Sequence, residues 1–294
     1  MSGTEEPTQS TKLLSRAKGR AARQRRRKLR DIQEAEEALR EGRSSSASTS
    51  IPSDRSSVWP AVLDCRSKYG WSQEDEMALV GQLGYLPGNA IGVCARASGV
   101  TCLGDIDGAE PVVLKLYPIA VREECSGSSA GGRRKARKRT RQAKDIADAS
   151  DAFSEKHLIE PFPTMYWVTS PMLRILISKL ELESFGVRLK EKLESETESL
   201  ESMRRAHVAY GKARKELLSD SDSALIMERK WESAFAETRG VAGLRHYSAI
   251  KCLHAHAAHF LSGENGSKDN AVGRWVMEEV ERRLREEGDS SKCE

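Results

Sequence analysis

The sequence has no long apolar run. Its longest candidates, such as Met172–Ile177, fall far short of the roughly 20 apolar residues that a membrane-spanning helix needs. The N-terminus also lacks the apolar core of a secretory signal, because Glu5 and Glu6 come early and a strongly basic stretch follows. We therefore expect a soluble intracellular protein, in the cytoplasm or the nucleus, and no contact with a membrane.

Cysteine and aromatic residues are both scarce. The six cysteines are scattered and include no Cys-x-x-Cys pair, which in a protein that is not exported indicates reduced thiols. Aromatic residues make up 5% of the chain, hydrophobic residues 38% and charged residues 31%, and the mean hydropathy is −0.58. This composition predicts a moderate core and a generous share of solvated chain.

The sequence also lacks an even distribution of charge along the chain. The net charge of +4 hides two basic segments, residues 1–50 and 122–148, each with a net charge of +5, while the rest of the chain carries −6. Their arginine-rich stretches are typical of arms that bind phosphates, so we expect contact with nucleic acid or another polyanion through residues 11–30 and 133–144. A solubilising tail is the alternative, because no aromatic residues alternate with the arginines.

The patterns predict one α+β domain at residues 59–287. A disordered, low-complexity basic tail is expected at 1–57, and a second, short tail at 288–294. The Gly/Ser-rich and then polybasic stretch at 119–157 cannot bury a core, so we interpret it as a flexible insertion within the domain.

A small three-stranded sheet packed against several helices is the expected core. Three segments bounded by glycine or proline have the composition of strands: 90–97, 111–118 and 164–169. Ser72 is suited to be the N-cap of a helix, and Pro171 to occupy the first position of another. Apolar residues then recur every three or four positions from Leu189 to Leu217, which predicts one long helix. A last helix is expected at Val272–Glu287.

The stretch IKCLHAHAAHF at 250–260 concentrates one cysteine and three histidines in a predicted helix. On a helix Cys252, His256 and His259 lie on one face, and thiolate and imidazole are the ligands that zinc prefers. His254 lies at the edge of the apolar face. The remote candidates for a fourth ligand are His207, Cys94 and Cys102. The alternative is a set of hydrogen-bonded core histidines, and a helix beginning near His254 would put Cys252 at its N-terminus.

An anion site is a second hypothesis for the same region. Gly240 and Gly243 lead from a loop into a helix N-terminus, where free N–H groups and the helix dipole favour phosphate or carboxylate. The glycines also suit a simple turn. The basic residues that would complete the site are Arg205, Arg239, Arg245 and Lys251.

Four separated motifs occur in an order that resembles a known family. PFPTMYWVTSP (161–171), RRAHVAYGKAR (204–214), GVAGLRHYSAIKCLHAHAAH (240–259) and NAVG (270–273) resemble the domain-of-unknown-function family 501, a mainly bacterial family without a settled activity. Besides Arg205, Lys251, Cys252 and His259, the resemblance singles out Thr164, Thr169, His207, Tyr210, His254 and Asn270. Ser170 stands where family members commonly have cysteine, which weakens a shared cysteine cluster. The resemblance names no catalytic residue.

Overall fold

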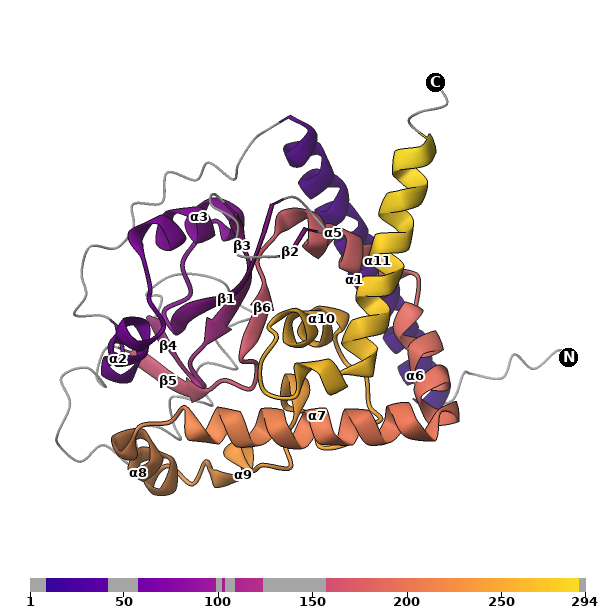
Figure 1. Cartoon of the computed structure of the whole chain (residues 1–294). Helices are drawn as coiled ribbons and strands as arrows, with labels where there is room; N and C mark the ends of the chain where they lie inside the picture. Colours follow the sequence, from indigo (N-terminus) through magenta and orange to yellow (C-terminus); the bar gives the residue numbers. More distant parts are fainter. Residues whose placement is uncertain (1–8, 42–57, 99–101, 104–108, 124–156, 291–294) are drawn as a thin grey trace, which may run out of the picture.

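The computed structural model of the chain describes residues 9–41, 58–98, 102–103, 109–123 and 157–290, and it has the α+β architecture that the sequence predicts (Figure 1). No helix in these ranges is both long enough and apolar enough to cross a membrane.

A four-stranded antiparallel sheet forms one side of the core. Its strands are β1 (Ala90–Ser98), β2 (Cys102–Leu103), β3 (Glu110–Leu116) and β6 (Tyr166–Val168), in the order β2-β1-β3-β6. The three predicted strands are confirmed as neighbours in this sheet, and β2 adds a short edge. In the register of β3 and β6, Leu114 faces Trp167.

A second pair of strands frames the predicted insertion. Strand β4 (Ile119–Glu123) pairs antiparallel with β5 (His157–Pro161), and Ile119 and Ile159 are buried in the same apolar cluster. The two ends of the predicted 119–157 segment therefore belong to the folded domain. The part from 124 to 156, which includes the basic stretch 133–144, lies outside the described residues.

Two helices precede the sheet and pack on it. Helix α2 (Pro60–Lys68) contacts β1, and α3 (Gln73–Leu83) contacts β3. The predicted N-cap is confirmed, because the hydroxyl of Ser72 accepts a hydrogen bond from the Asp75 N–H at 3.1 Å. Helix α2 was not predicted, and its face carries little apolar periodicity.

The single long helix predicted up to Leu217 is wrong. Helix α5 (Pro171–Leu182) is followed by α6 (Phe185–Ser195) and α7 (Thr197–Glu216), and Glu196 between the last two has extended backbone angles. The break changes the direction of the chain, so that Leu193 and Met203 are both buried in one core cluster. A break of one residue cannot be detected from apolar spacing alone, because the helical spacing of apolar residues continues on both sides of it.

Helix α10 (Leu253–Leu261) lies at the centre of the C-terminal half (Figure 1). It contacts α5, β6 and α11 (Ala271–Ser290), which confirms the predicted last helix. The remaining short helices are α8 (Asp220–Glu228), α9 (Glu232–Phe235) and the 3₁₀ turns η2 (Val241–Gly243) and η3 (Ser267–Asp269).

The described part of the basic tail is helix α1 (Gln9–Arg40), which contacts α5. Most of its described side chains are exposed, as a helix without an apolar stripe requires. Ile32 is buried, at 8% exposed, and Lys28 and Glu36, four positions away on either side, are partly buried. The described side chains of the tail therefore touch the domain through one narrow face.

Candidate metal site at the start of helix α10

Cys252 is the N-cap residue of helix α10, so the prediction of a cysteine at a helix N-terminus is confirmed. The cysteine side chain makes no capping hydrogen bond. Instead, the first N–H of the helix, that of Leu253, donates to Glu181 Oε1 of helix α5 at 2.8 Å. A carboxylate from a distant segment thus satisfies a free N–H and meets the positive end of the helix dipole.

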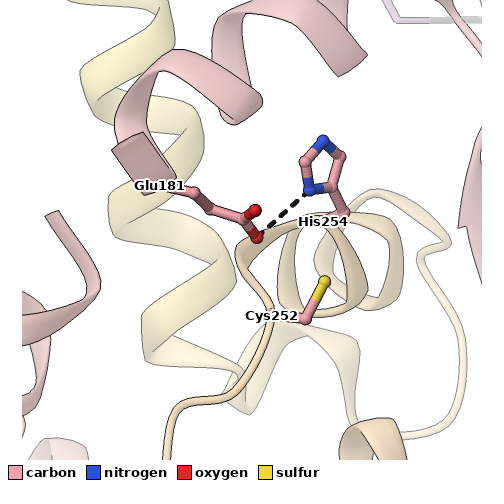
Figure 2. Close-up of side chains that lie close together, drawn as sticks. All are labelled: Glu181, Cys252 and His254. Carbon is pink, nitrogen blue, oxygen red and sulfur yellow. Dashed lines mark hydrogen bonds and ion pairs between the residues drawn. The ribbon is translucent and has the colours of Figure 1, made fainter. Parts of the chain in front are cut away.

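His254, the second residue of α10, points toward the same carboxylate (Figure 2). Its Nδ1 lies 3.2 Å from Glu181 Oε1, and its Nε2 lies 3.1 Å from the carbonyl oxygen of Arg174. Ser178 Oγ is a further neighbour of Nε2 at 3.3 Å. Because a carbonyl only accepts, Nε2 carries a hydrogen, and the ring is held with Nδ1 toward Glu181.

Glu181, Cys252 and His254 bring three different ligand types together (Figure 2). One oxygen, the sulfur and one ring nitrogen all lie within 4.8 Å of one another, and no other group of three or more such residues among the described residues meets this spacing. Cys252 is a free, partly exposed cysteine. The arrangement can hold a transition-metal ion after a small movement of the side chains, since ligands of one tetrahedral zinc ion are roughly 3.3–3.7 Å apart.

The electrostatics of the group are those of an ion pair. Burial disfavours the charged imidazole, but hydrogen bonds with Cys252 and Glu181 outweigh it and raise the pKa of His254 to about 9. Burial likewise opposes the charge of Glu181, and hydrogen bonds from His254 and Lys28 outweigh it and lower the pKa of that carboxyl to about 2. At neutral pH the group therefore contains an imidazolium and a carboxylate.

Lys28 of helix α1 supplies the second positive charge. Its ammonium group forms an ion pair with Glu181 Oε2, the oxygen that neither Leu253 nor His254 uses. Glu181 belongs to none of the sites predicted from sequence, and Lys28 was predicted only as part of the polyanion-binding segment 11–30. Both are far from Cys252 in the chain, and no local spacing links them to it, so only the packing of α1 and α10 on α5 reveals them.

The other two histidines of α10 lie in the core. His256 and His259 are fully buried, and Asn270 joins them: its Oδ1 lies 3.3 Å from His256 Nδ1, and its Nδ2 lies 3.1 Å from His259 Nδ1. His259 Nε2 lies 3.1 Å from the carbonyl oxygen of Asn265, so Nε2 carries the hydrogen and Nδ1 accepts from Asn270. Burial lowers the pKa of His256 to about 3 and that of His259 to about 4.

The structure therefore divides the predicted Cys252, His256 and His259 set. Cys252 lies with Glu181 and His254, while the two histidines are engaged with Asn270 on the opposite side of the helix. Cys94, a proposed fourth ligand, is partly buried on β1, and desolvation raises the pKa of its thiol. The side chain of Cys102 lies outside the described part of the structure.

His207 and Tyr210, which the family resemblance singled out, pack against this core group. The His207 and His256 ring centroids are 6.3 Å apart, and burial lowers the pKa of His207 to about 4. The Tyr210 hydroxyl accepts a hydrogen bond from the Met165 N–H at 2.6 Å, and its ring meets that of His259 edge-on. Thr169 donates to the Pro111 carbonyl oxygen at 2.8 Å, and Thr164 is partly buried.

The four basic residues of the predicted anion site have separate surroundings. Arg205 pairs with Asp269 at 2.7 Å, and Arg239 donates to the carbonyl oxygens of Ser233 and Gly243. Arg245 and Lys251 are exposed. The anion that meets the N-terminus of α10 is the carboxylate of Glu181.

Comparison with known proteins gives one match. The family model described as "Protein of unknown function (DUF501)" matches residues 107–278, more than half of the chain. The match contains Glu181, Cys252 and His254 and leaves helix α1, with Lys28, outside it. No curated protein and no solved structure matches the chain.

Proposed function

Because the chain belongs to the DUF501 family, whose description names no activity, we propose a function from its own side chains: it binds a transition-metal ion, zinc in the first place, through Glu181, Cys252 and His254. The observation that carries the proposal is the meeting of a thiol, an imidazole and a carboxylate within 4.8 Å. Thiolate and imidazole favour zinc and its neighbours over magnesium or calcium.

The orientation of His254 supports this proposal. Histidines that bind metals commonly donate their second ring N–H to a carbonyl or carboxylate, which fixes the ring and its tautomer. His254 Nε2 meets the Arg174 carbonyl oxygen at 3.1 Å in this way, so that Nδ1 is the nitrogen available to a metal. Glu181 is fixed as well, because the Leu253 N–H holds its Oε1.

Metal binding at this group displaces protons. Without a metal, Nδ1 of His254 carries the hydrogen that Glu181 accepts, as the pKa of about 9 requires. A metal ion replaces that hydrogen and the thiol hydrogen of Cys252, so binding weakens as the pH falls. Three protein ligands leave a coordination position for water or another small ligand, which is the pattern of open zinc sites.

The metal hypothesis is favoured over the anion hypothesis by the charges around α10. An incoming anion would compete with Glu181 for the Leu253 N–H. Arg205 and Arg239, two of the residues expected to attract it, are paired with Asp269 and with backbone carbonyls. A metal ion instead uses the carboxylate that is already in place.

The test is a titration of the purified full chain with Co²⁺, whose absorption reports sulfur ligation, together with metal analysis of the protein as isolated. We expect about one ion per chain, and loss of the sulfur-dependent absorption in Cys252→Ser. Glu181→Gln and His254→Gln are expected to weaken binding by about 10–100-fold.

Cys65→Ser is the matched control, because Cys65 is another free, partly exposed cysteine, on α2 and away from the group. It is expected to bind like the wild type. A wild-type protein that takes up no more Co²⁺ than Cys252→Ser would exclude the proposed function. Cys252 must stay reduced to bind a metal, so the proposed function requires a reducing compartment.

A second candidate function, association with nucleic acid, is favoured by helix α1. Its exposed arginines form a basic surface: Arg23, Arg25, Arg26, Arg27 and Arg30. Such a surface binds phosphates without sequence preference, and affinity falls steeply with salt. RNA and DNA binding of the full chain is compared with a chain lacking 1–57 and 122–148. Equal binding by the two would rule this candidate out.

A further inference from the structure

Helix α1 contacts helix α5, and three of its described residues, spaced by four positions, lie on the face that is withdrawn from solvent. Lys28 pairs with Glu181, Ile32 is 8% exposed, and Glu36 pairs with Lys179 at 2.5 Å. Residues four apart lie above one another on a helix, so these three define one face. Through it, a basic segment outside the family match reaches the proposed metal site.

The Lys28 ammonium occupies a position that matters for any metal at this site. Glu181 Oε1 is held by the Leu253 N–H and faces His254, and Oε2 is held by Lys28. A divalent ion bound by the same carboxylate would lie within a few ångströms of the ammonium. Two cations at that distance repel each other strongly where solvent is partly excluded.

From these contacts we propose that helix α1 is a built-in competitor for the metal: with Lys28 on Glu181 the site is closed to the ion, and metal binding releases the helix. The inference rests on the proposed function and specifies its regulation. Docking of α1 and occupation of the site are then linked equilibria, and each weakens the other by the same factor.

The contact is weak enough to be reversible. The side chains of Lys28 and Lys179 are each 36% exposed, and ion pairs of this kind contribute little to stability. Among the side chains of α1 that the structure describes, which begin at residue 22, Ile32 is the buried apolar one. Over this part of α1, two partly exposed ion pairs and one apolar side chain hold the helix, and such a contact opens far more easily than the domain unfolds.

The test compares the affinity of the full chain for Co²⁺ alone in matched variants. Lys28→Met removes the competing charge and is expected to bind Co²⁺ about fivefold or more tightly than the wild type. Ile32→Asn weakens the docking of α1 without touching Glu181, and a gain in the same direction is expected. Arg26→Met removes the same charge from an exposed position and is expected to change the affinity by less than about twofold.

The reciprocal effect is measured by limited trypsin cleavage within residues 23–30. Zn²⁺ is expected to speed this cleavage in the wild type and to have no effect in Cys252→Ser. Equal Co²⁺ affinities for the wild type, Lys28→Met and Ile32→Asn would overturn the competition while leaving metal binding intact. If Cys252→Ser bound Co²⁺ as tightly as the wild type, the proposed function would fail and this inference with it.

Discussion

The two sides of helix α10 give a histidine side chain opposite charge states at neutral pH. On the side that faces α5, His254 is charged, because hydrogen bonds with Cys252 and Glu181 outweigh the effect of burial and raise its pKa to about 9. On the side that faces the core, His259 is neutral, because burial lowers its pKa to about 4. The two rings are only five positions apart in the sequence.

This difference shows that burial alone does not decide the protonation state of a histidine. Both sides remove water from the ring, which penalises the imidazolium. On the α5 side a carboxylate hydrogen-bonds the ring in return, while on the core side the ring's partners are the neutral amide of Asn270 and the carbonyl oxygen of Asn265. The core side is therefore suited to hold structure together, and the α5 side to exchange protons for a cation.

The largest effect on the core side is expected from Asn270→Ala. Asn270 is fully buried and bonds to His256, His259 and the Gly273 N–H. Its loss leaves several buried polar groups unpaired, so we expect the free energy of unfolding to fall by about 3 kcal/mol in urea denaturation. Ser202→Ala, which removes a half-exposed bond to Asp269, should lower it by less than about 1 kcal/mol. A similar small change in Asn270→Ala would show that the network is not structural.

A smaller, pH-dependent effect is expected from His207→Leu. Neither ring nitrogen of His207 has a hydrogen-bond partner among the described residues, and burial lowers its pKa to about 4. Since the unfolded value is near 6.5, the folded protein loses stability as the pH falls from about 6.5 toward 4. Between about pH 6.5 and 5 this amounts to about 2 kcal/mol for one histidine.

Urea denaturation at both pH values tests this contribution. Titration of His207 should cost the wild type about 2 kcal/mol of unfolding free energy between about pH 6.5 and 5. His207→Leu lacks this group, so over the same range its unfolding free energy should rise by about 2 kcal/mol relative to that of the wild type. The exposed His246 serves as control, and His246→Leu should follow the wild type. Parallel pH profiles for the wild type and His207→Leu would mean that the His207 ring is hydrated in solution.

Much of this fold could be predicted from sequence because its signals are local. Ser72, Pro171 and the glycine- and proline-bounded strands each act within a few residues, and all are confirmed in the structure. The break at Glu196 was missed because an extended residue leaves the apolar spacing on either side unchanged.

The candidate site was predicted only in part. The helix position of Cys252 follows from the pattern around it, but its partner Glu181 comes from a helix that meets α10 only through tertiary packing. The angular argument placed His254 near the apolar face, and the structure has it on the side of α5, where a carboxylate and a carbonyl satisfy both ring nitrogens. Helix periodicity shows which residues of one helix share a face. It does not show which polar residue of another helix packs against that face.

The smallest stability effect, on the α5 side, is expected from Glu181→Gln in protein kept free of metal by a chelator. Glutamine preserves the oxygen that accepts from Leu253 but loses the charge that faces His254. We therefore expect the pKa of His254, measured by NMR titration, to fall from about 9 toward its ordinary range. That of His259 should remain near 4.

The sign of the accompanying stability change follows from the raised pKa of His254. The His254–Glu181 pair stabilises the folded state fully below the unfolded pKa of about 6.5, and this contribution is lost as the pH rises through about 9. The wild type should therefore exceed Glu181→Gln in unfolding free energy by about 1 kcal/mol at about pH 6, and the gap should narrow as the pH rises through about 9, until only the contribution of the Glu181–Lys28 ion pair is left. Glu183→Gln, which removes an ion pair with Arg283 at the end of the same helix, should leave the titration of His254 unchanged. If His254 of the wild type titrated near 6.5, Glu181 would not keep it charged at neutral pH. The histidines on the two sides of α10 would then both be largely neutral, and the contrast between the sides would be lost.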